Sequence, residues 1–144
     1  KLIDMARVSA SKAGVSDRLK FEKGNAAKLR FDDNSYDMVI STGMLHMLKD
    51  PIKVLRECYR VLRPGGEAWI YDPAQVGNRV DVKRWRASLT FKERFMFILF
   101  PYFSRINPPH YYNREEVIPL IAATEFKEYG IEQEGREIKI KLKK

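Results

Sequence analysis

The feature that most constrains the fold of this chain is a pair of strand-like segments separated by one amphipathic helix. Residues 36–41 contain the continuous apolar run Met38-Val39-Ile40, which is typical of a strand buried on both faces. Asp50-Pro51 then predicts a helix start, because aspartate caps a helix N-terminus and proline suits its first turn. A second strand is predicted at residues 68–71. The order strand, helix, strand favours an α/β layer with a largely parallel sheet.

Further elements are predicted on both sides of this unit. Apolar residues at helical spacing indicate a helix over residues 2–13, with Gly14 as its C-terminal glycine, and residues 19–23 alternate like a short strand. The central helix should end at the sequence Pro64-Gly65-Gly66, with Cys58 on its buried face. A helix over 114–123 and a hairpin of strands 127–132 and 136–143 complete the prediction.

Composition narrows the class of protein. The chain has 144 residues, with 12% aromatic residues and a formal net charge of +8, which fits one globular domain and argues against disorder. A single cysteine excludes a disulfide framework, and two histidines offer too few ligands for a histidine-based metal site, so no metal is expected. The longest apolar run, residues 95–100, is far too short to span a membrane. Without a visible signal peptide, the expected compartment is the cytoplasm.

Several short strings, taken together over residues 1–72, carry a resemblance to one family. They are Phe21-Glu22-Lys23-Gly24-Asn25-Ala26, Asn34-Ser35-Tyr36-Asp37-Met38-Val39, Leu45-His46, and Arg60-Val61-Leu62-Arg63-Pro64-Gly65-Gly66. Their order and spacing resemble the class I S-adenosylmethionine-dependent methyltransferases of small-molecule type. The resemblance implies a Rossmann-like, doubly wound, mostly parallel sheet in the order 3-2-1-4-5-7-6, with a C-terminal antiparallel strand pair.

The resemblance also implies a cofactor, S-adenosyl-L-methionine, and a set of residues near it. Ligands of a doubly wound sheet lie beyond the carboxyl ends of its strands. The side chain of Asn25 would face the adenine amino group. The alternatives are that Asn25 is a simple turn residue and that His46 is a packing residue. The cofactor-binding residues implied by the resemblance are Gly24, Asn25, Ala26, Ser41, Thr42, Gly43, Leu45 and His46.

One part of the family pattern is not found in this sequence. The family's glycine-rich loop after its first strand and the acidic residue that ends its second strand have no counterpart here, and Lys1 opens directly into a helical pattern. We therefore expect residues 1–144 to form a partial methyltransferase domain that lacks its N-terminal strands. The strand at 19–23 would then lack its sheet neighbours, and should be displaced, paired with another chain or poorly ordered.

The segment 79–112 is rich in aromatic and basic residues and matches nothing in the family pattern. We interpret it as a cover over the substrate side of the site. A homodimer contact, a membrane-surface helix or ordinary core are the alternatives. The candidate substrate-binding residues are Asp72, His110, Tyr111 and Tyr112. The alternative interpretation is that these residues anchor loops.

These observations predict methyl transfer from S-adenosylmethionine to a small-molecule acceptor, and the apolar cover would suit a hydrophobic one. No catalytic residue is assigned, because methyl transfer from a sulfonium depends mainly on positioning and needs a base only for some acceptors. The alternative is a non-catalytic, methyltransferase-like module that binds a partner chain or nucleic acid. Nucleic acid is not an obligatory partner, because the basic residues are spread along the chain.

Overall fold

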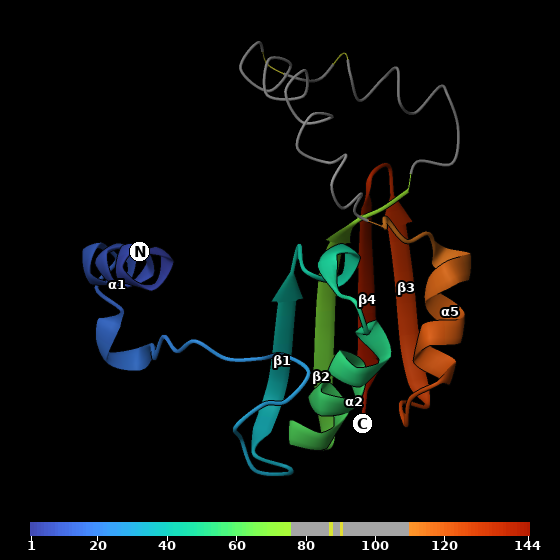
Figure 1. Cartoon of the computed structure of the whole chain (residues 1–144), viewed down its shortest axis with the longest axis horizontal. Coiled ribbons are helices and arrows are strands. Elements are labelled where there is room, and N and C mark those ends of the chain that lie inside the picture. Colours follow the sequence, from blue (N-terminus) through green and yellow to red (C-terminus); the bar gives the residue numbers. More distant parts are fainter. Residues whose placement is uncertain (76–86, 88–89, 91–109) are drawn as a thin grey trace. The chain divides into compact units, whose positions relative to one another are not determined.

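The computed structural model describes residues 1–75, 87, 90 and 110–144 (Figure 1). The chain divides into two compact units, Lys1–Arg30 and Phe31–Lys144. Most of the segment 79–112, predicted as a cover, lies outside the described residues. No helix among the described residues is long and apolar enough to cross a membrane.

The first unit contains α1 (Leu2–Lys12) and the short 3-10 helix η1 (Ser16–Arg18). Gly14 follows α1 with φ +67°, a left-handed conformation that glycine adopts at little cost, so the predicted helix and its terminal glycine are confirmed. The strand predicted at 19–23 is wrong, because these residues form no strand. A strand needs the backbone groups of a neighbour, and no described strand pairs with this segment.

The second unit is built on a four-stranded sheet in the order β1-β2-β4-β3 (Figure 1). The strands β1 (Tyr36–Thr42) and β2 (Leu62–Pro73) are parallel. The hairpin of β3 (Glu128–Glu134) and β4 (Glu137–Lys143) is antiparallel, and β4 pairs antiparallel with β2. The order corresponds to the last four strands of the implied family order, 4-5-7-6, so the mixed α/β sheet with its C-terminal antiparallel pair is confirmed.

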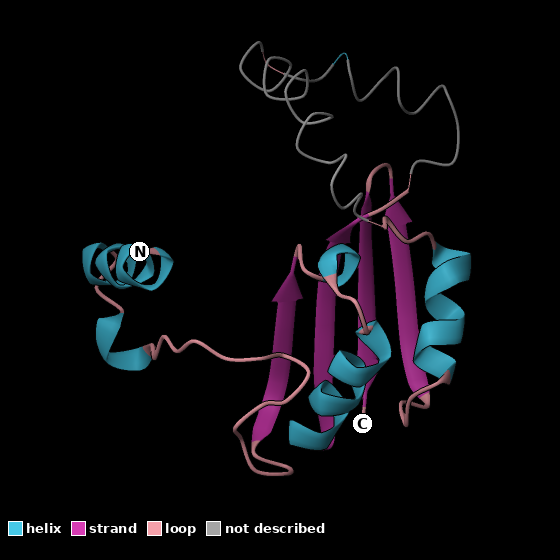
Figure 2. Ribbon diagram, viewed as in Figure 1, coloured by secondary structure: helices cyan, strands magenta, loops and turns pink. Residues whose placement is uncertain are grey.

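Helices α2 (Pro51–Val61) and α5 (Arg114–Ala122) pack side by side on one face of this sheet (Figure 2). Both begin as predicted. Asp50 caps α2 by accepting from the Lys53 backbone N–H, and Asn113 with Glu116 forms a reciprocal capping box at α5. The core between helices and sheet is apolar and includes Leu55, Cys58, Val61, Ala68, Ile70, Val117, Ile121, Ile138, Ile140 and Leu142.

The sequence Pro64-Gly65-Gly66 has a different role from the one predicted. Helix α2 already ends at Val61, and the three residues lie inside β2. Proline disfavours helical backbone at the residue before it, so Arg63 cannot prolong the helix. A Cβ on Gly66 would lie 2.9 Å from the backbone oxygen of Asp37, so glycine allows β2 to pass close to β1 where their register shifts.

Candidate functional site

The candidate site lies at the carboxyl ends of β1 and β2, the parallel pair of the sheet. The chain leaves β1 at Thr42, turns at Gly43 with φ +61°, and enters the 3-10 helix η2 (Leu45–Met47). The Gly43 backbone N–H donates to the Tyr71 carbonyl oxygen at 2.7 Å, which holds the turn against β2. In an open α/β sheet, loops at these strand ends are where ligands bind.

Asp72 fixes this loop from the neighbouring strand. Its side chain is fully buried, with 0% exposed. Its Oδ1 accepts from the Leu45 backbone N–H at 2.9 Å, and its Oδ2 accepts from the His46 backbone N–H at 2.9 Å. The carboxylate thus satisfies the first two donors of η2, which have no partner inside so short a helix.

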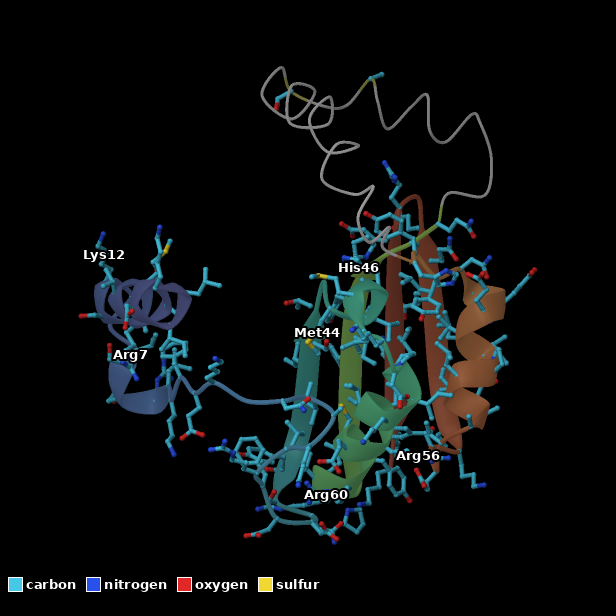
Figure 3. The ribbon with its side chains drawn as sticks, viewed as in Figure 1. Arg7, Lys12, Met44, His46, Arg56 and Arg60 are labelled. Carbon is cyan, nitrogen blue, oxygen red and sulfur yellow. The ribbon has the colours of Figure 1, made fainter. Side chains whose placement is uncertain are left out.

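The His46 side chain completes the contacts of this carboxylate. Its Nδ1 lies 3.0 Å from Asp72 Oδ2, and the side chain is 13% exposed. The ring stacks on Tyr111, with ring centroids 5.3 Å apart and an interplanar angle of 28°. Figure 3 places His46, with Met44 near it, at the end of the sheet to which the arrows of β1 and β2 point; Arg60 lies at the opposite end.

The segment before α5 closes over the same end of the sheet. The His110 backbone N–H donates to the His46 carbonyl oxygen at 3.3 Å, and the Gln75 N–H donates to the Tyr112 carbonyl oxygen at 3.1 Å. The His110 ring packs edge-on against Tyr112, and its Nε2 lies 3.6 Å from a Glu116 carboxylate oxygen. Two stretches far apart in sequence therefore join at His46.

One ionisable group in this segment has a shifted pKa. Burial raises the pKa of the Tyr112 hydroxyl above its ordinary value, and the negative charges of Glu116 and Asp72 act in the same direction. Tyr112 therefore keeps its proton at neutral pH, and it can donate a hydrogen bond there.

A cavity of about 530 Å³ opens beside the loop. Its lining includes Thr42 and Gly43 as well as charged residues of the β3–β4 hairpin, among them Glu132, Arg136 and Lys139. The volume falls within the range of small-molecule sites. The cavity therefore gives two of the predicted cofactor residues a space in which to meet a ligand.

The predicted residues of the first unit form a turn. The Asn25 Oδ1 accepts from the Ala27 backbone N–H at 3.0 Å, and Asn25 pairs with Lys28 in an isolated bridge. Gly24 has no heavy atom within 4 Å of the place where a Cβ would stand. The structure thus confirms that Asn25 is a turn residue. The contact of Gly24, Asn25 and Ala26 with adenine stays a prediction.

The second unit brings together most of the remaining predicted residues. Ser41, Thr42, Gly43, Leu45, His46, Asp72, Tyr111 and Tyr112 all lie at one end of the sheet. For Asp72 the loop-anchoring alternative is observed, through the hydrogen bonds to Leu45 and His46. Sequence reasoning missed the pairing of Asp72 with His46, since 26 positions separate them and no local pattern links them. The described residues hold no group of three or more side chains suited to a metal ion.

Comparison with known proteins identifies relatives for this sequence. A family model described as a methyltransferase domain matches residues 1–70. The chain is 38% identical over 90 residues to the 27-O-demethylrifamycin SV methyltransferase of Amycolatopsis mediterranei, covering 60% of this chain and 33% of that protein. It is 30% identical over 139 residues to the demethylmenaquinone methyltransferase of Lactobacillus johnsonii, covering 94% of this chain and 53% of that protein. The chain thus spans between a third and about half of the length of these curated relatives.

Solved structures share the fold. An S-adenosylmethionine-dependent methyltransferase from Aquifex aeolicus matches with a TM-score of 0.67 at 18% identity, covering 98% of this chain and 62% of that one. Another from Thermotoga maritima matches with a TM-score of 0.62 at 18% identity, covering 94% of this chain and 70% of that one. At this level of identity the likeness concerns the fold alone.

Proposed function

Since the chain belongs to the class I S-adenosylmethionine-dependent methyltransferases, we propose that the protein transfers a methyl group from this cofactor to a small-molecule acceptor. The observation that carries the proposal is the loop at 43–47, held at the carboxyl ends of the parallel strands by the buried carboxylate of Asp72. A loop fixed in this way can present its backbone to a ligand with little entropy left to lose.

The residues of this chain fit the cofactor. A Cβ would meet nothing within 4 Å at either Gly24 or Gly43, so a ligand can approach both stretches of backbone closely. The Asn25 Oδ1 already accepts one backbone hydrogen bond, and its second lone pair can accept from an adenine amino group. We propose Asn25 and Ala26 as contacts of the adenine, and we propose Ser41, Thr42, Gly43, Leu45 and His46 as further contacts of the cofactor.

The protein's own contribution to the chemistry is positioning. The cofactor, when bound, supplies a methyl group on a sulfonium that is already activated toward transfer. Asp72 fixes the backbone at Leu45 and His46, while Tyr111 covers the His46 ring. Together these contacts orient the loop at this end of the sheet.

We place the acceptor among small molecules. Support comes from the two curated relatives, whose names give demethylrifamycin SV and demethylmenaquinone as their substrates. Support also comes from the cavity of about 530 Å³ beside Gly43, which is of a size to hold a small molecule.

Calorimetry with S-adenosylhomocysteine tests the proposal on the chain of residues 1–144. We expect binding at micromolar strength, weakened about tenfold in Asn25→Leu, because leucine cannot accept a hydrogen bond from adenine. The matched control is Asn34→Ser, since Asn34 also stands in a turn and belongs to the other unit. Absence of binding by the chain would favour a non-catalytic module that binds a partner.

A further inference from the structure

We propose that residues 1–144 form a twofold-symmetric dimer through the free edge of β1, which pairs antiparallel with β1 of a second copy. The free edge is the side of Tyr36–Thr42 that faces away from β2. In the described sheet β1 is a terminal strand, and β2 is its one neighbour (Figure 1). Such an edge presents a row of backbone N–H and C=O groups on which another strand can pair.

The direction of the β1 backbone is fixed by hydrogen bonds just before and just after the strand. The N–H groups of Ser35 and Gly43 both donate to carbonyl oxygens of the chain on the β2 side, at 2.8 and 2.7 Å. Successive residues of a strand direct their backbone groups to opposite sides. The residues directed away from β2 are therefore Tyr36, Met38, Ile40 and Thr42. None of them pairs on that side with a described strand.

The side chains along the free edge are apolar and exposed. Met38 and Ile40 stand in register with Glu67 and Trp69 of β2, whereas the intervening Ala68 is buried under the helices. Met38 and Ile40 thus lie on the face of the sheet opposite to α2 and α5, and they are 44% and 60% exposed. An edge strand that stays unpaired is normally blunted by charge or proline, and neither stands at these two positions.

The other edge of the same sheet is blunted in this way. A strand laid beside β3 would meet the carboxylates of Glu128, Glu132 and Glu134. The charged residue of β1 is Asp37, and its carboxylate already pairs with Arg63 at 2.8 Å. Of the two edges of the described sheet, β1 is therefore the one suited to receive a strand.

The sequence of β1 is complementary to itself when the twofold axis passes beside Val39. Met38 then stands opposite Ile40 of the second copy, and their outward backbone groups can exchange two hydrogen bonds. The apolar side chains of this pair lie on the same face and can pack together. Asp37 stands opposite Ser41 of the second copy, so the two copies place no like charges opposite each other.

A second copy is the occupant that this edge fits best. Pairing of β1 with β1 uses the same surface on both subunits and is complete after two subunits. Pairing of β1 with β3 of another copy would continue into a filament, and the glutamates of β3 disfavour it. One short strand pair buries less surface than a stable interface requires, so we expect a weak dimer with a dissociation constant on the order of 10 µM.

Sedimentation equilibrium of the whole chain, from about 1 to 200 µM, tests the dimer. We expect a monomer–dimer equilibrium, and Ile40→Lys should weaken it at least tenfold because the two copies would then place charges at the shared edge. The matched control is Tyr129→Lys, which changes an apolar residue of β3 that is 48% exposed and should leave the equilibrium unchanged. A wild type that stays monomeric, or a dimer that only Tyr129→Lys disrupts, would overturn the proposal.

A disulfide at the twofold axis tests the register without relying on a disrupted variant. Val39 directs its backbone toward β2, so the two copies of Val39 form a non-hydrogen-bonded pair with Cα atoms about 4.5 Å apart, which a disulfide can bridge. Mild oxidation should therefore link Val39→Cys into a covalent dimer. In Asp37→Cys the two cysteines would stand four residues apart along the strands, about 13 Å, and should not link. The wild type is the background, because Cys58 is buried. Equal linking of the two variants would contradict the proposed pairing.

Discussion

The Asp72 carboxylate accepts a hydrogen bond from the Leu45 backbone N–H at 2.9 Å, although 27 positions separate the two residues. The contact joins the end of β2 to the first residue of η2, and both residues are buried. A buried carboxylate is costly unless its oxygens are satisfied, and here each oxygen accepts a backbone N–H. The geometry of the candidate site therefore depends on one side chain from the neighbouring strand.

Replacing Asp72 by alanine should destabilise the unit Phe31–Lys144 by about 3 kcal/mol, because donors of Leu45 and His46 lose their acceptor. Urea unfolding followed by tryptophan fluorescence measures this change. The control Asp37→Ala removes an exposed carboxylate that pairs with Arg63, and it should alter the midpoint little. Equal effects of the two substitutions would argue against the anchoring role.

Gly66→Ala should destabilise the fold by about 2 kcal/mol, since the added Cβ would meet the backbone oxygens of Asp37 and Arg63 at 2.9 and 3.0 Å. Thermal unfolding provides the measurement. Gly130→Ala is the matched control in β3, because a Cβ there meets nothing within 4 Å. A Gly66→Ala protein as stable as the Gly130→Ala protein would show that β1 and β2 do not approach so closely.

Gly43→Ala should weaken the binding of S-adenosylhomocysteine about tenfold, because a methyl group would occupy the space into which the ligand approaches. Gly65→Ala is the control for backbone strain, since Gly65 has φ +81° and Gly43 has φ +61°, and neither position crowds a Cβ. Gly65 lies at the opposite end of β2 from the site. Binding is measured by calorimetry. The same loss of affinity in both variants would show that backbone strain alone causes it.

Burial raises the pKa of the Cys58 thiol to about 11, from an ordinary value of 9.0. The folded state thus favours the neutral thiol, and its stabilising contribution is complete below pH 9.0 and is lost as the pH rises toward 11. We expect the free energy of unfolding to fall by on the order of 2 kcal/mol over this interval from the thiol alone.

Urea titrations of the wild type and of Cys58→Val, at a series of alkaline pH values, isolate this effect. Valine fills a similar volume without a titrating group, so the difference between the two proteins should grow above pH 9.0. A difference that stays constant with pH would mean that Cys58 is accessible to solvent when folded.

Elements whose signals are local can be predicted from the amino-acid sequence. The apolar run Met38-Val39-Ile40 predicts β1, the Asp50-Pro51 cap predicts α2, and the alternation of Ile138, Ile140 and Leu142 with lysines predicts β4. Side-chain periodicity and helix capping involve only residues that are close together in the chain. Both signals can therefore be recognised in a single sequence. The family resemblance added the strand order, which the four strands confirm.

Other features of the protein depend on residues that are distant in the sequence and meet only in the folded chain. Residues 19–23 alternate like a strand but form none, because a strand exists only when another strand satisfies its backbone groups. The sequence Pro64-Gly65-Gly66 predicts the end of a helix. In the structure Gly66 instead lies in β2, where its missing side chain lets the strand pass close to the backbone of Asp37. Above all, the contact between Asp72 and His46 joins the end of β2 to η2, and only the folded sheet brings the two side chains within 3.0 Å of each other. Residues that lie 26 positions apart in the chain carry no local signal of such a contact.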